Sequence, residues 1–380
     1  MHPLLGWAKH RERDLISLIG EFVECESPSD DARAVNRFVD LVTGALQSSG
    51  PRLKRFPGGE FGDHLGCDFR APGAARDGHI LVLAHSDTVW PAGTLRRMPF
   101  RHRGGRLWGP GVLDMKAGIA FFIFAMRALA ELGIPLKRRV LLQINSDEEV
   151  GSPSSRSLTE QAAVGASAVL VVEPGTGPEG RLKTARKGVG NYDLRVKGRA
   201  SHAGVDFEAG ASAVVELARQ IERIAAFTDP ARGITVNPGV ISGGTRSNVV
   251  AAEALAEIDM RVLRLRDAAA LDRKFRRLRP MDKRCSIEVT GGLNRPPMER
   301  TRASRALYAT AQAAAAELGI EIDESLSGGG SDGNFTAALG VPTLDGLGAV
   351  GEGAHALNES ILVKRIADRI ALLAALIARI

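Results

Sequence analysis

The sequence has few of the residues and runs that mark several large classes of protein. It holds three cysteines, Cys25, Cys67 and Cys285, which are widely spaced and odd in number. This excludes a disulfide framework and a Cys-x-x-Cys metal site, and it indicates free thiols. The most apolar C-terminal run, 370–378, is short against the ~20 residues that span a bilayer, and charges interrupt residues 1–22 too early for a signal-peptide core. We expect a soluble, cytoplasmic protein with no membrane partner.

Size, composition and charge are those of an ordinary globular protein with room for two domains. The chain has 380 residues, 44% of them hydrophobic and 25% charged, whereas a single core usually stops growing near ~250–300 residues. Lys and Arg number 50 against 44 Asp and Glu, but the basic residues are scattered and lack aromatic interleaving. We therefore expect no nucleic-acid partner and assign the basic excess to a solvated surface with some attraction for anionic substrates.

Compact apolar runs alternate with helical patterns over the first half of the chain. The expected helices cover 12–25, 32–48 and 117–133, and the expected strands cover 79–84, 138–145 and 167–172. Strands buried on both faces and separated by helices indicate an α/β fold with a mixed, largely parallel sheet flanked by helices. Ligand sites in such sheets collect at the carboxyl ends of the strands, where His85, 146–149 and Glu173 fall.

After Lys187 the pattern changes. Strands at 192–198 and 254–263 alternate polar and apolar residues, with helices at about 208–226 and 267–278, which favours a smaller α+β domain with an antiparallel sheet. The first pattern then returns with a helix at 301–318, a Gly-rich loop at 327–334, a strand at 341–345 and a helix at 361–379. We predict a discontinuous domain of residues 1–187 and 298–380, into which residues 188–297 are inserted.

Histidines and acidic residues stand just after several of these strands or in loops. The candidate metal ligands are His85, Asp114, Glu149, Glu173 and His355. Two imidazoles and three carboxylates suit two ions of zinc, cobalt or manganese about 3.5–4 Å apart that share Asp114. Acidic residues and a histidine would rarely end three apolar strands by chance, and without a metal they would leave several like charges in one cleft. The sequence predicts a metal-dependent hydrolase.

Two carboxylates beside these ligands have other expected tasks. Asp87 is placed to accept the second N–H of the His85 imidazole and so orient the ring. Glu148 and Glu149 point different ways if their segment is extended, so that one binds metal while the other takes a proton from a bridging water. Each motif alone has an ordinary interpretation as a surface turn or a helix cap. Their coincidence favours the metal site.

A glycine-rich run and several isolated polar residues carry weaker signals. The run 328–333 lacks the Lys-Ser/Thr pair of a phosphate-binding loop, which argues against nucleotide binding, although its glycines allow close approach of backbone to a substrate. His202 follows a polar strand and is as readily a surface histidine as a functional one. By residue type alone, Asn248, Arg261 and Arg295 are ordinary surface residues.

Taken together, eight motifs resemble the M20 family of co-catalytic zinc peptidases and amidohydrolases, and most of all its glutamate carboxypeptidases of the carboxypeptidase G2 type. The motifs are LAHSDTV (83–89), GPGVLDMKAG (109–118), SDEEVGS (146–152), VVEPG (171–175), GRASHAG (198–204), SGGTRSNVV (242–250), GGGSDGNF (328–335) and GEGAHALNE (351–359). They span nearly the whole chain in the order that the family has. The resemblance is therefore specific for the family.

The resemblance implies two Zn²⁺ ions per subunit. His85, Asp114 and Glu173 would hold one ion, and Asp114, Glu149 and His355 would hold the other. Co²⁺ or Mn²⁺ are possible substitutes, and Glu148 would be the general base.

The resemblance also implies tasks for the inserted domain. It would be a lid or dimerisation domain of a homodimer, in which His202 steadies the oxyanion in the partner subunit's site. Asn248, Arg261 and Arg295 would contact the carboxylate of the substrate, and Gly329 and Gly330 would line its pocket.

The implied substrate is an N-acyl amino acid or a short peptide with a free C-terminal carboxylate, cleaved at its amide bond. Within the same family, an N-acetylornithine deacetylase, a succinyl-diaminopimelate desuccinylase or a dipeptidase is the alternative, and residues of the side-chain pocket would discriminate among them. Outside enzymes, a catalytically silent metal-binding scaffold protein is the alternative. The intact Glu148 and the complete ligand set argue against it.

Overall fold

The computed structural model describes residues 2–47, 49–70 and 75–380, which fall into two compact units. Unit 1 comprises Met1–Ala185, Arg300–Ser327 and Ser331–Ile380. Unit 2 comprises Arg186–Glu299 together with Gly328–Gly330, a run that the sequence analysis had placed in the first domain. No helix among the described residues is long and apolar enough to cross a membrane.

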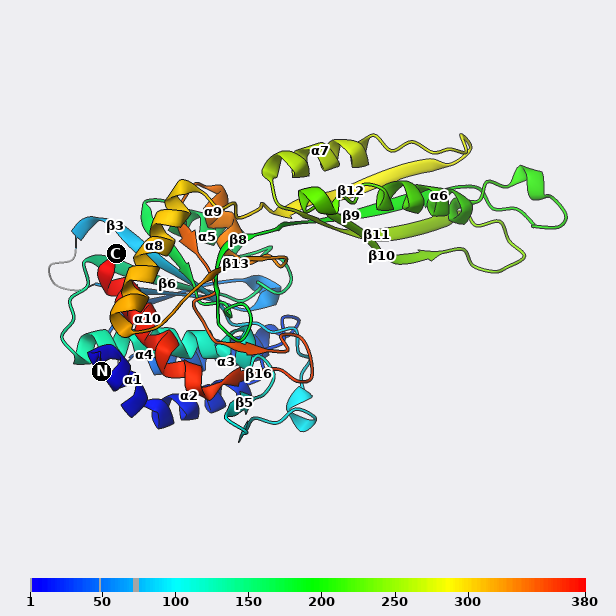
Figure 1. The fold of residues 1–380 in the computed structure, drawn as a ribbon. Helices are drawn as coiled ribbons and strands as arrows, with labels where there is room; N and C mark the ends of the chain where they lie inside the picture. The colour runs from blue at the N-terminus through cyan, green and yellow to red at the C-terminus, as the bar shows by residue number, and fades with distance from the viewer. Residues whose placement is uncertain (1, 48, 71–74) are drawn as a thin grey trace. The chain divides into compact units, whose positions relative to one another are not determined.

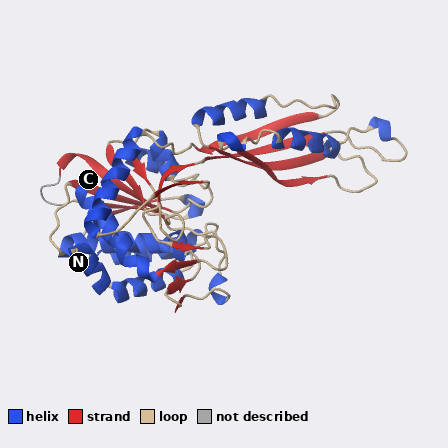
Figure 2. Ribbon diagram, viewed as in Figure 1, coloured by secondary structure: helices blue, strands red, loops and turns tan. Residues whose placement is uncertain are grey.

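Unit 1 is built on a six-stranded sheet, whose ribbons can be followed in Figures 1 and 2. The strands follow one another across it in the order β1 (Arg52–Phe56), β2 (His64–Phe69), β6 (Arg138–Asn145), β3 (Ala75–His85), β7 (Ala166–Val171) and β14 (Thr343–Leu344). The pairs β6–β3, β3–β7 and β7–β14 are parallel, whereas β1–β2 and β2–β6 are antiparallel. The mixed, largely parallel sheet predicted from the sequence is confirmed.

Helices flank this sheet because its central strands are apolar on both faces. They are α1 (Pro3–His10), α2 (Glu12–Glu24), α3 (Ala32–Gln47), α4 (Ala117–Glu131), α5 (Arg156–Ala163), α8 (Arg302–Leu318), α9 (Gly333–Ala338) and α10 (Ile366–Arg379). Ile80 and Val82 of β3 belong to a large core that includes α4 and α10, whereas Leu81 and Leu83 pack with Ala163 of α5. Successive side chains of a strand take opposite faces, so both faces need cover.

Two smaller sheets complete unit 1. One has the order β15 (Gly351–Glu352), β16 (Ser360–Leu362), β5 (Arg106–Trp108) and β4 (Arg101–Arg103), and the other pairs β13 (Glu324–Ser327) with β8 (Leu182–Arg186). Ser360 to Leu362 pair with β5, so α10 begins at Ile366 and the predicted start at residue 361 was wrong. The apolar residues at 361–362 fit the spacing of a helix, but they form a strand because they pair with β5. The last residue of the predicted helix 32–48 lies outside the described residues.

Unit 2 is an antiparallel sheet with helices on one face. Its strand order is β10 (Thr235–Gly243), β11 (Glu253–Val262), β9 (Gly188–Lys197) and β12 (Ser286–Arg295), and its helices are α6 (Ala213–Ala225) and α7 (Leu265–Arg276). Residues of β9 alternate between buried and exposed along most of the strand, which is the pattern of a sheet covered on one side. Ser212 caps α6 by accepting a hydrogen bond from the N–H of Val215, so this helix begins later than the predicted residue 208.

Substitution of alanine for two helical glycines should change the stability of the fold in opposite directions. An added Cβ at Gly118 in α4 would lie 2.1 Å from the carbonyl oxygen of Val172, whereas at exposed Gly44 in α3 it would meet nothing within 4 Å. We expect Gly118→Ala to destabilise the fold by about 1–3 kcal/mol through overpacking and Gly44→Ala to stabilise it by about 0.5–1 kcal/mol. Urea denaturation measures both values, and equal shifts would contradict the close approach at Gly118.

Candidate metal centre

Three neighbouring strands of the unit 1 sheet lead to the predicted ligands. His85 is the last residue of β3, the Glu148–Glu149 pair follows β6, and Glu173 follows β7. Asp114 comes from the turn before α4, and His355 comes from the loop between β15 and β16. The carboxyl ends of parallel strands meet at one edge of a sheet, so these segments are brought to the same place.

The five predicted ligands form two groups that share one carboxylate. Nε2 of His85 lies 3.1 Å from Oδ1 of Asp114 and 3.4 Å from Oε1 of Glu173. Nε2 of His355 lies 3.4 Å from the other oxygen of Asp114, Oδ2, and 3.3 Å from Oε2 of Glu149. Asp114 therefore stands between the two imidazoles and offers one oxygen to each.

Glu148 lies close to the same cluster. One ligand atom each of His85, Glu148 and Glu173 lie within 4.8 Å of one another. The segment is a turn in which the N–H of Gly151 donates to the carbonyl of Glu148 at 3.0 Å, so the condition of an extended segment is not met. The two glutamates still part, since Glu149 contacts His355. Glu148 is therefore close enough to the cluster either to transfer a proton there or to bind a metal ion.

The side chain of Asp87 stabilises the turn at Glu148 and Glu149. Its buried carboxylate accepts hydrogen bonds from the backbone N–H of Glu148 at 3.2 Å and of Glu149 at 3.1 Å, and from the hydroxyl of Ser29 at 2.8 Å. Nδ1 of His85 lies 2.9 Å from the backbone carbonyl of Asp87 and 3.4 Å from its carboxylate. The main chain of Asp87 is thus the nearer partner of the imidazole, while its side chain shapes the Glu148–Glu149 turn.

The charges of the cluster fit divalent cations. Burial works to lower the pKa of His85, but hydrogen bonds to Asp114, Asp87 and Glu173 outweigh it and hold the pKa well above its usual value. Hydrogen bonds to Asp114 and Glu149 raise the pKa of His355 to about 10. Burial raises the pKa of Glu149 to about 7, and Oε1 of Glu149 is buried without a hydrogen-bond partner among the described residues. Protonated imidazoles offset the carboxylates here, and metal ions would offset them instead.

In unit 2, three predicted substrate-contacting residues gather at one end of the sheet. Arg261 of β11 pairs with Val189 of β9, which pairs in turn with Arg295 of β12. An added Cβ on Gly330 would lie 2.8 Å from Cδ of Arg295 and 2.9 Å from Val189, so the glycine run packs over this row. Arg261 is already paired, since its Nη2 lies 2.8 Å from Oδ2 of Asp259.

His202 and Asn248 lie beyond the other end of the same sheet. His202 bridges Val249, and the N–H of Ala203 donates to the carbonyl of Asn248 at 3.0 Å. The ladder from Val189 to Lys197 separates them from Arg261 by ~26 Å, at ~3.3 Å per residue. Within one chain they therefore cannot contact one small substrate together with Arg261.

The ring of His202 is exposed and oriented. Its Nδ1 accepts from the N–H of Gly204 at 3.2 Å and from that of Val205 at 3.1 Å. A ring nitrogen that accepts carries no proton, so neutral His202 has its proton on Nε2. The exposed side chain therefore offers an N–H donor.

A family model described as Peptidase family M20/M25/M40 matches residues 81–379. The chain belongs to this family. It is therefore an enzyme of the metallopeptidase class, whose members depend on metal, and the resemblance found in the sequence is confirmed.

Curated M20 relatives cover most of the chain. Carboxypeptidase G2 of Pseudomonas sp. (strain RS-16) is 28% identical over 348 residues, which are 90% of this chain and 83% of the relative. Succinyl-diaminopimelate desuccinylase of Acidovorax ebreus is 27% identical over 350 residues, which are 85% of this chain and 88% of the relative.

Solved structures show the same fold at lower identity. Aminopeptidase PepT from Bacillus cereus has a TM-score of 0.81 at 23% identity and covers 97% of this chain and 98% of its own. The M20 family metallo-carboxypeptidase Sso-CP2 from Sulfolobus solfataricus has a TM-score of 0.70 at 16% identity and covers 96% of this chain and 99% of its own.

Two residues near the M20 motifs were missed in the sequence. Nη1 of the buried Arg186 donates to the carbonyls of Gly329 at 3.0 Å and Gly330 at 2.7 Å, and so holds the glycine run in unit 2. Glu359 lies within the GEGAHALNE motif and is fully buried. The signal for Glu359 was its place in that motif, whereas Arg186 had no signal in the sequence.

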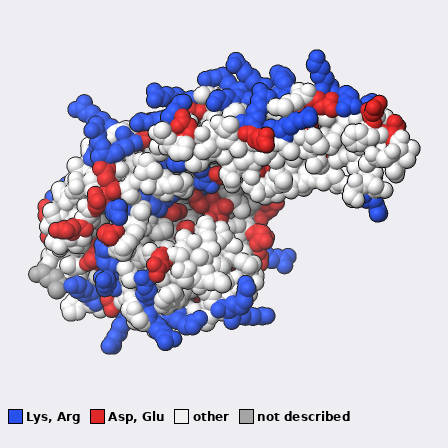
Figure 3. All heavy atoms as spheres, turned by 45° about the vertical axis from the view of Figure 1, so that its right-hand side comes forward, with Lys and Arg blue, Asp and Glu red and all other residues white. Residues whose placement is uncertain are grey.

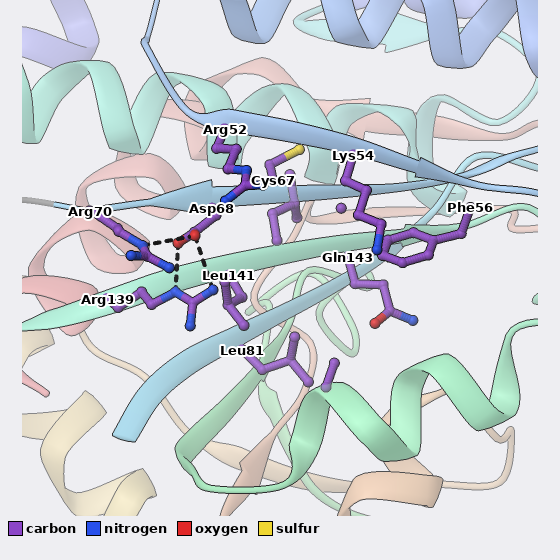
Figure 4. A pocket seen from close by; sticks show the side chains of 13 residues that line it. Arg52, Lys54, Phe56, Cys67, Asp68, Arg70, Leu81, Arg139, Leu141 and Gln143 are labelled. Atoms are coloured by element: carbon purple, nitrogen blue, oxygen red, sulfur yellow. Dashed lines mark hydrogen bonds and ion pairs between the residues drawn. The ribbon is translucent and has the colours of Figure 1, made fainter. Parts of the chain in front are cut away.

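A separate cavity of about 250 Å³ lies over β1, β2, β6 and β3, and none of the candidate site residues lines it (Figure 4). Asp68 there accepts from Arg139 at 2.6 and 3.0 Å and from Arg70 at 2.9 Å. Long basic side chains cover its apolar floor while their charged ends reach water. Figure 3 shows Lys and Arg spread over the visible surface, with Asp and Glu among them.

Proton release on metal binding tests the candidate centre. At about pH 8, below the pKa of about 10 for His355, that imidazole is protonated in the metal-free protein, and the raised pKa of His85 favours its protonated form too. Both imidazoles must lose their proton to bind metal. We expect about two protons from the imidazoles, and up to one more from a metal-bound water, to be released when Zn²⁺ fills both positions, and affinity to fall as the pH is lowered. Calorimetric titration in buffers of different ionisation enthalpy measures the release.

A His355→Ala variant is the control for this measurement. It should release about one proton fewer, because only His85 then titrates against the metal. An unchanged release in this variant would show that His355 is not a ligand.

Proposed function

We propose that this chain is a di-zinc hydrolase that cleaves the amide bond of N-acyl amino acids or short peptides with a free C-terminal carboxylate, in the manner of a glutamate carboxypeptidase. The observation that carries the proposal is Asp114, with one oxygen toward His85 and the other toward His355. The similarity to carboxypeptidase G2 over 90% of the chain supports this substrate class. A cytoplasmic location is part of the proposal.

The metal positions follow from the two groups of side chains. His85, Asp114 and Glu173 would hold one zinc ion, and Asp114, Glu149 and His355 would hold the second. When bound, the ions polarise the amide carbonyl and lower the pKa of water toward ~7. Co²⁺ or Mn²⁺ would suit the same imidazole and carboxylate donors.

The chain's own residues then move the protons and fix the substrate. Glu148 accepts a proton from the attacking water and returns it to the leaving nitrogen. His202 donates from Nε2 to the developing oxyanion, a kind of contact worth roughly 3–4 kcal/mol in other enzymes. Arg261 and Arg295 from one chain and Asn248 from a second copy contact the carboxylate of the substrate, and Gly329 and Gly330 line its pocket.

Other activities of the family remain alternatives. The desuccinylase of Acidovorax ebreus is nearly as similar in identity and coverage as carboxypeptidase G2, so a succinyl-diaminopimelate substrate is the second candidate. An N-acetylornithine deacetylase and a dipeptidase are further alternatives, and a silent scaffold protein is the alternative without turnover.

Turnover of a substrate panel decides among these alternatives. We expect zinc-loaded protein to hydrolyse N-acyl-glutamate or N-acyl-aspartate with kcat/KM at least about tenfold above the values for N-acetylornithine, N-succinyl-diaminopimelate and dipeptides, a difference of about 1.4 kcal/mol in transition-state binding. Ninhydrin-type detection of the released amine measures the rates. Preference for the succinyl substrate would move the assignment to the desuccinylases, and no turnover of any member would favour the scaffold.

Glu148→Ala is the control that ties turnover to the cluster. It should keep both metal equivalents and lose most of kcat, since the residue moves a proton without holding metal. Loss of one metal equivalent would instead make Glu148 a ligand, which its distance from His85 and Glu173 allows. Asp114→Ala should weaken both equivalents.

We also propose a homodimer formed through unit 2. β10 is an edge strand, and its Val240 and Ile241 are 54% and 63% exposed. Val214 and Val215 of α6 are likewise exposed. An uncovered edge with apolar side chains is a surface that a second copy would cover by symmetry. Because His202 and Arg261 lie at opposite ends of one sheet, two chains would be needed to bring both kinds of residue to one substrate.

Mixing two inactive chains tests this shared site. A heterodimer of Glu148→Ala and His202→Ala chains contains one site with intact Glu148 from one chain and intact His202 from the other. We expect recovery of up to about one wild-type site per heterodimer. The rate after exchange, confirmed by mass labelling of the subunits, is the measurement. No recovery despite complete exchange would show that His202 acts in its own chain or has no catalytic part.

A further inference from the structure

One fully buried carboxylate outside the ligand set, that of Glu359, accepts four hydrogen bonds. Oε1 accepts from the backbone N–H of Leu113 at 2.9 Å and of Asp114 at 3.1 Å. Oε2 accepts from the N–H of Gly111 at 2.9 Å and from the indole of Trp90 at 2.7 Å. Three of these donors belong to the turn that carries Asp114.

The turn at 111–114 depends on this acceptor. Gly111 takes a φ of +71°, which favours glycine, and an added Cβ there would also lie 2.8 Å from Thr88. The backbone N–H groups of Gly111, Leu113 and Asp114 find their acceptor in Glu359 rather than in a helix or a strand. A buried N–H without an acceptor costs free energy, so loss of the carboxylate would rearrange the turn.

Glu359 also belongs to the segment that carries His355. This loop runs from β15 to β16, and within it the N–H of Ala356 donates to Gly353 at 2.8 Å and that of Glu359 donates to Ala356 at 2.9 Å. The next residue, Ser360, pairs with Trp108 of β5, a few residues before Gly111. Glu359 therefore joins the segment of Asp114 to the segment of His355.

We propose that Glu359 is a positioning residue for one of the two metal positions, the one assigned to Asp114, Glu149 and His355. This inference rests on the proposed di-metal site. Two of the three ligands of that position come from the segments that Glu359 joins. The other position shares Asp114, but its His85 ends β3 and its Glu173 follows β7, and the central sheet holds both strands in place. Loss of the Glu359 carboxylate should therefore weaken one metal equivalent far more than the other.

Glu359→Gln tests this selectivity. The amide keeps the shape of the side chain but turns an NH₂ group toward one pair of donors, so those N–H groups lose their acceptor. We expect the Kd of one equivalent to rise about 10–100-fold, as for other residues that orient metal ligands, while the Kd of the other equivalent, which shares only Asp114 with these segments, rises far less. Chelator competition with metal-depleted full-length protein and Co²⁺ or Zn²⁺ measures both constants without any substrate.

Glu216→Gln is the matched control. The carboxylate of Glu216 in unit 2 is also buried and accepts backbone N–H bonds, from Met281 at 2.9 Å and Asp282 at 3.0 Å, but it touches no segment with a predicted ligand. It should lower the thermal stability and leave both metal constants unchanged. Equal weakening of both equivalents by Glu359→Gln, or weakening of either by Glu216→Gln, would show a general loss of stability and overturn the inference.

Two further variants separate position from charge. Glu359→Asp keeps the charge but is one methylene shorter, so it should lose affinity in the same equivalent, whereas wild-type affinity would overturn a positioning role. If Glu359→Gln does not fold, Trp90→Phe removes a single donor and should weaken that equivalent several-fold, and equal weakening of both would overturn the inference. The His355→Ala background identifies the equivalent, because Glu359→Gln should add little there.

Failure of the inference and failure of the proposed function give different results. Wild-type protein that binds fewer than two metal ions would refute the di-metal proposal itself. Wild-type protein that binds two ions, together with unchanged constants in Glu359→Gln, would refute only the task of Glu359.

Discussion

Repulsion among carboxylates at one edge of the unit 1 sheet is the constraint on which the site depends. Asp114, Glu149 and Glu173 are brought within reach of two imidazoles, and burial makes uncompensated negative charge costly there. The raised pKa values of His85 and His355 show how the metal-free protein offsets these charges, since protons take the place of cations. The cluster needs positive charge, and Oε1 of Glu149 is buried with no hydrogen-bond partner in the part of the chain that the structure describes, so the cluster is suited to divalent metal.

Two further carboxylates keep these groups in place without being candidate ligands themselves. Asp87 and Glu359 each accept backbone N–H bonds from the turn that carries an acidic residue of the cluster, Glu149 in one case and Asp114 in the other. Strand ends alone fix only the positions of His85 and Glu173. Turns lack the ladder of a sheet, so their N–H groups need side-chain acceptors, and a carboxylate can serve several at once.

The sequence predicted best what periodicity and strand ends determine. The strand 138–145 was predicted to the residue because its apolar run is buried on both faces, and His85 and Glu173 were found because they end or follow such strands. Prediction from the sequence failed where contacts between distant segments determine the local structure. Residues 360–362 join β5, which delays α10, and Asp87 turns the backbone at Glu148. Hydrogen bonds between segments tens of residues apart leave no periodic trace, so Glu359 and Arg186 were missed.

In unit 2, the strand pairing of β9 separates two sets of predicted substrate-contacting residues. Side chains expected to contact one substrate lie at both ends of β9. Arg261 and Arg295 lie at one end, and His202 and Asn248 lie beyond the other. A strand is stiff and its length is fixed by its residues, so no side-chain rotation closes a gap of ~26 Å. The two ends can act on one small molecule only if they come from different chains. Pairing of two copies through the exposed edge strand β10 would bring His202 and Asn248 of one chain to the substrate of the other.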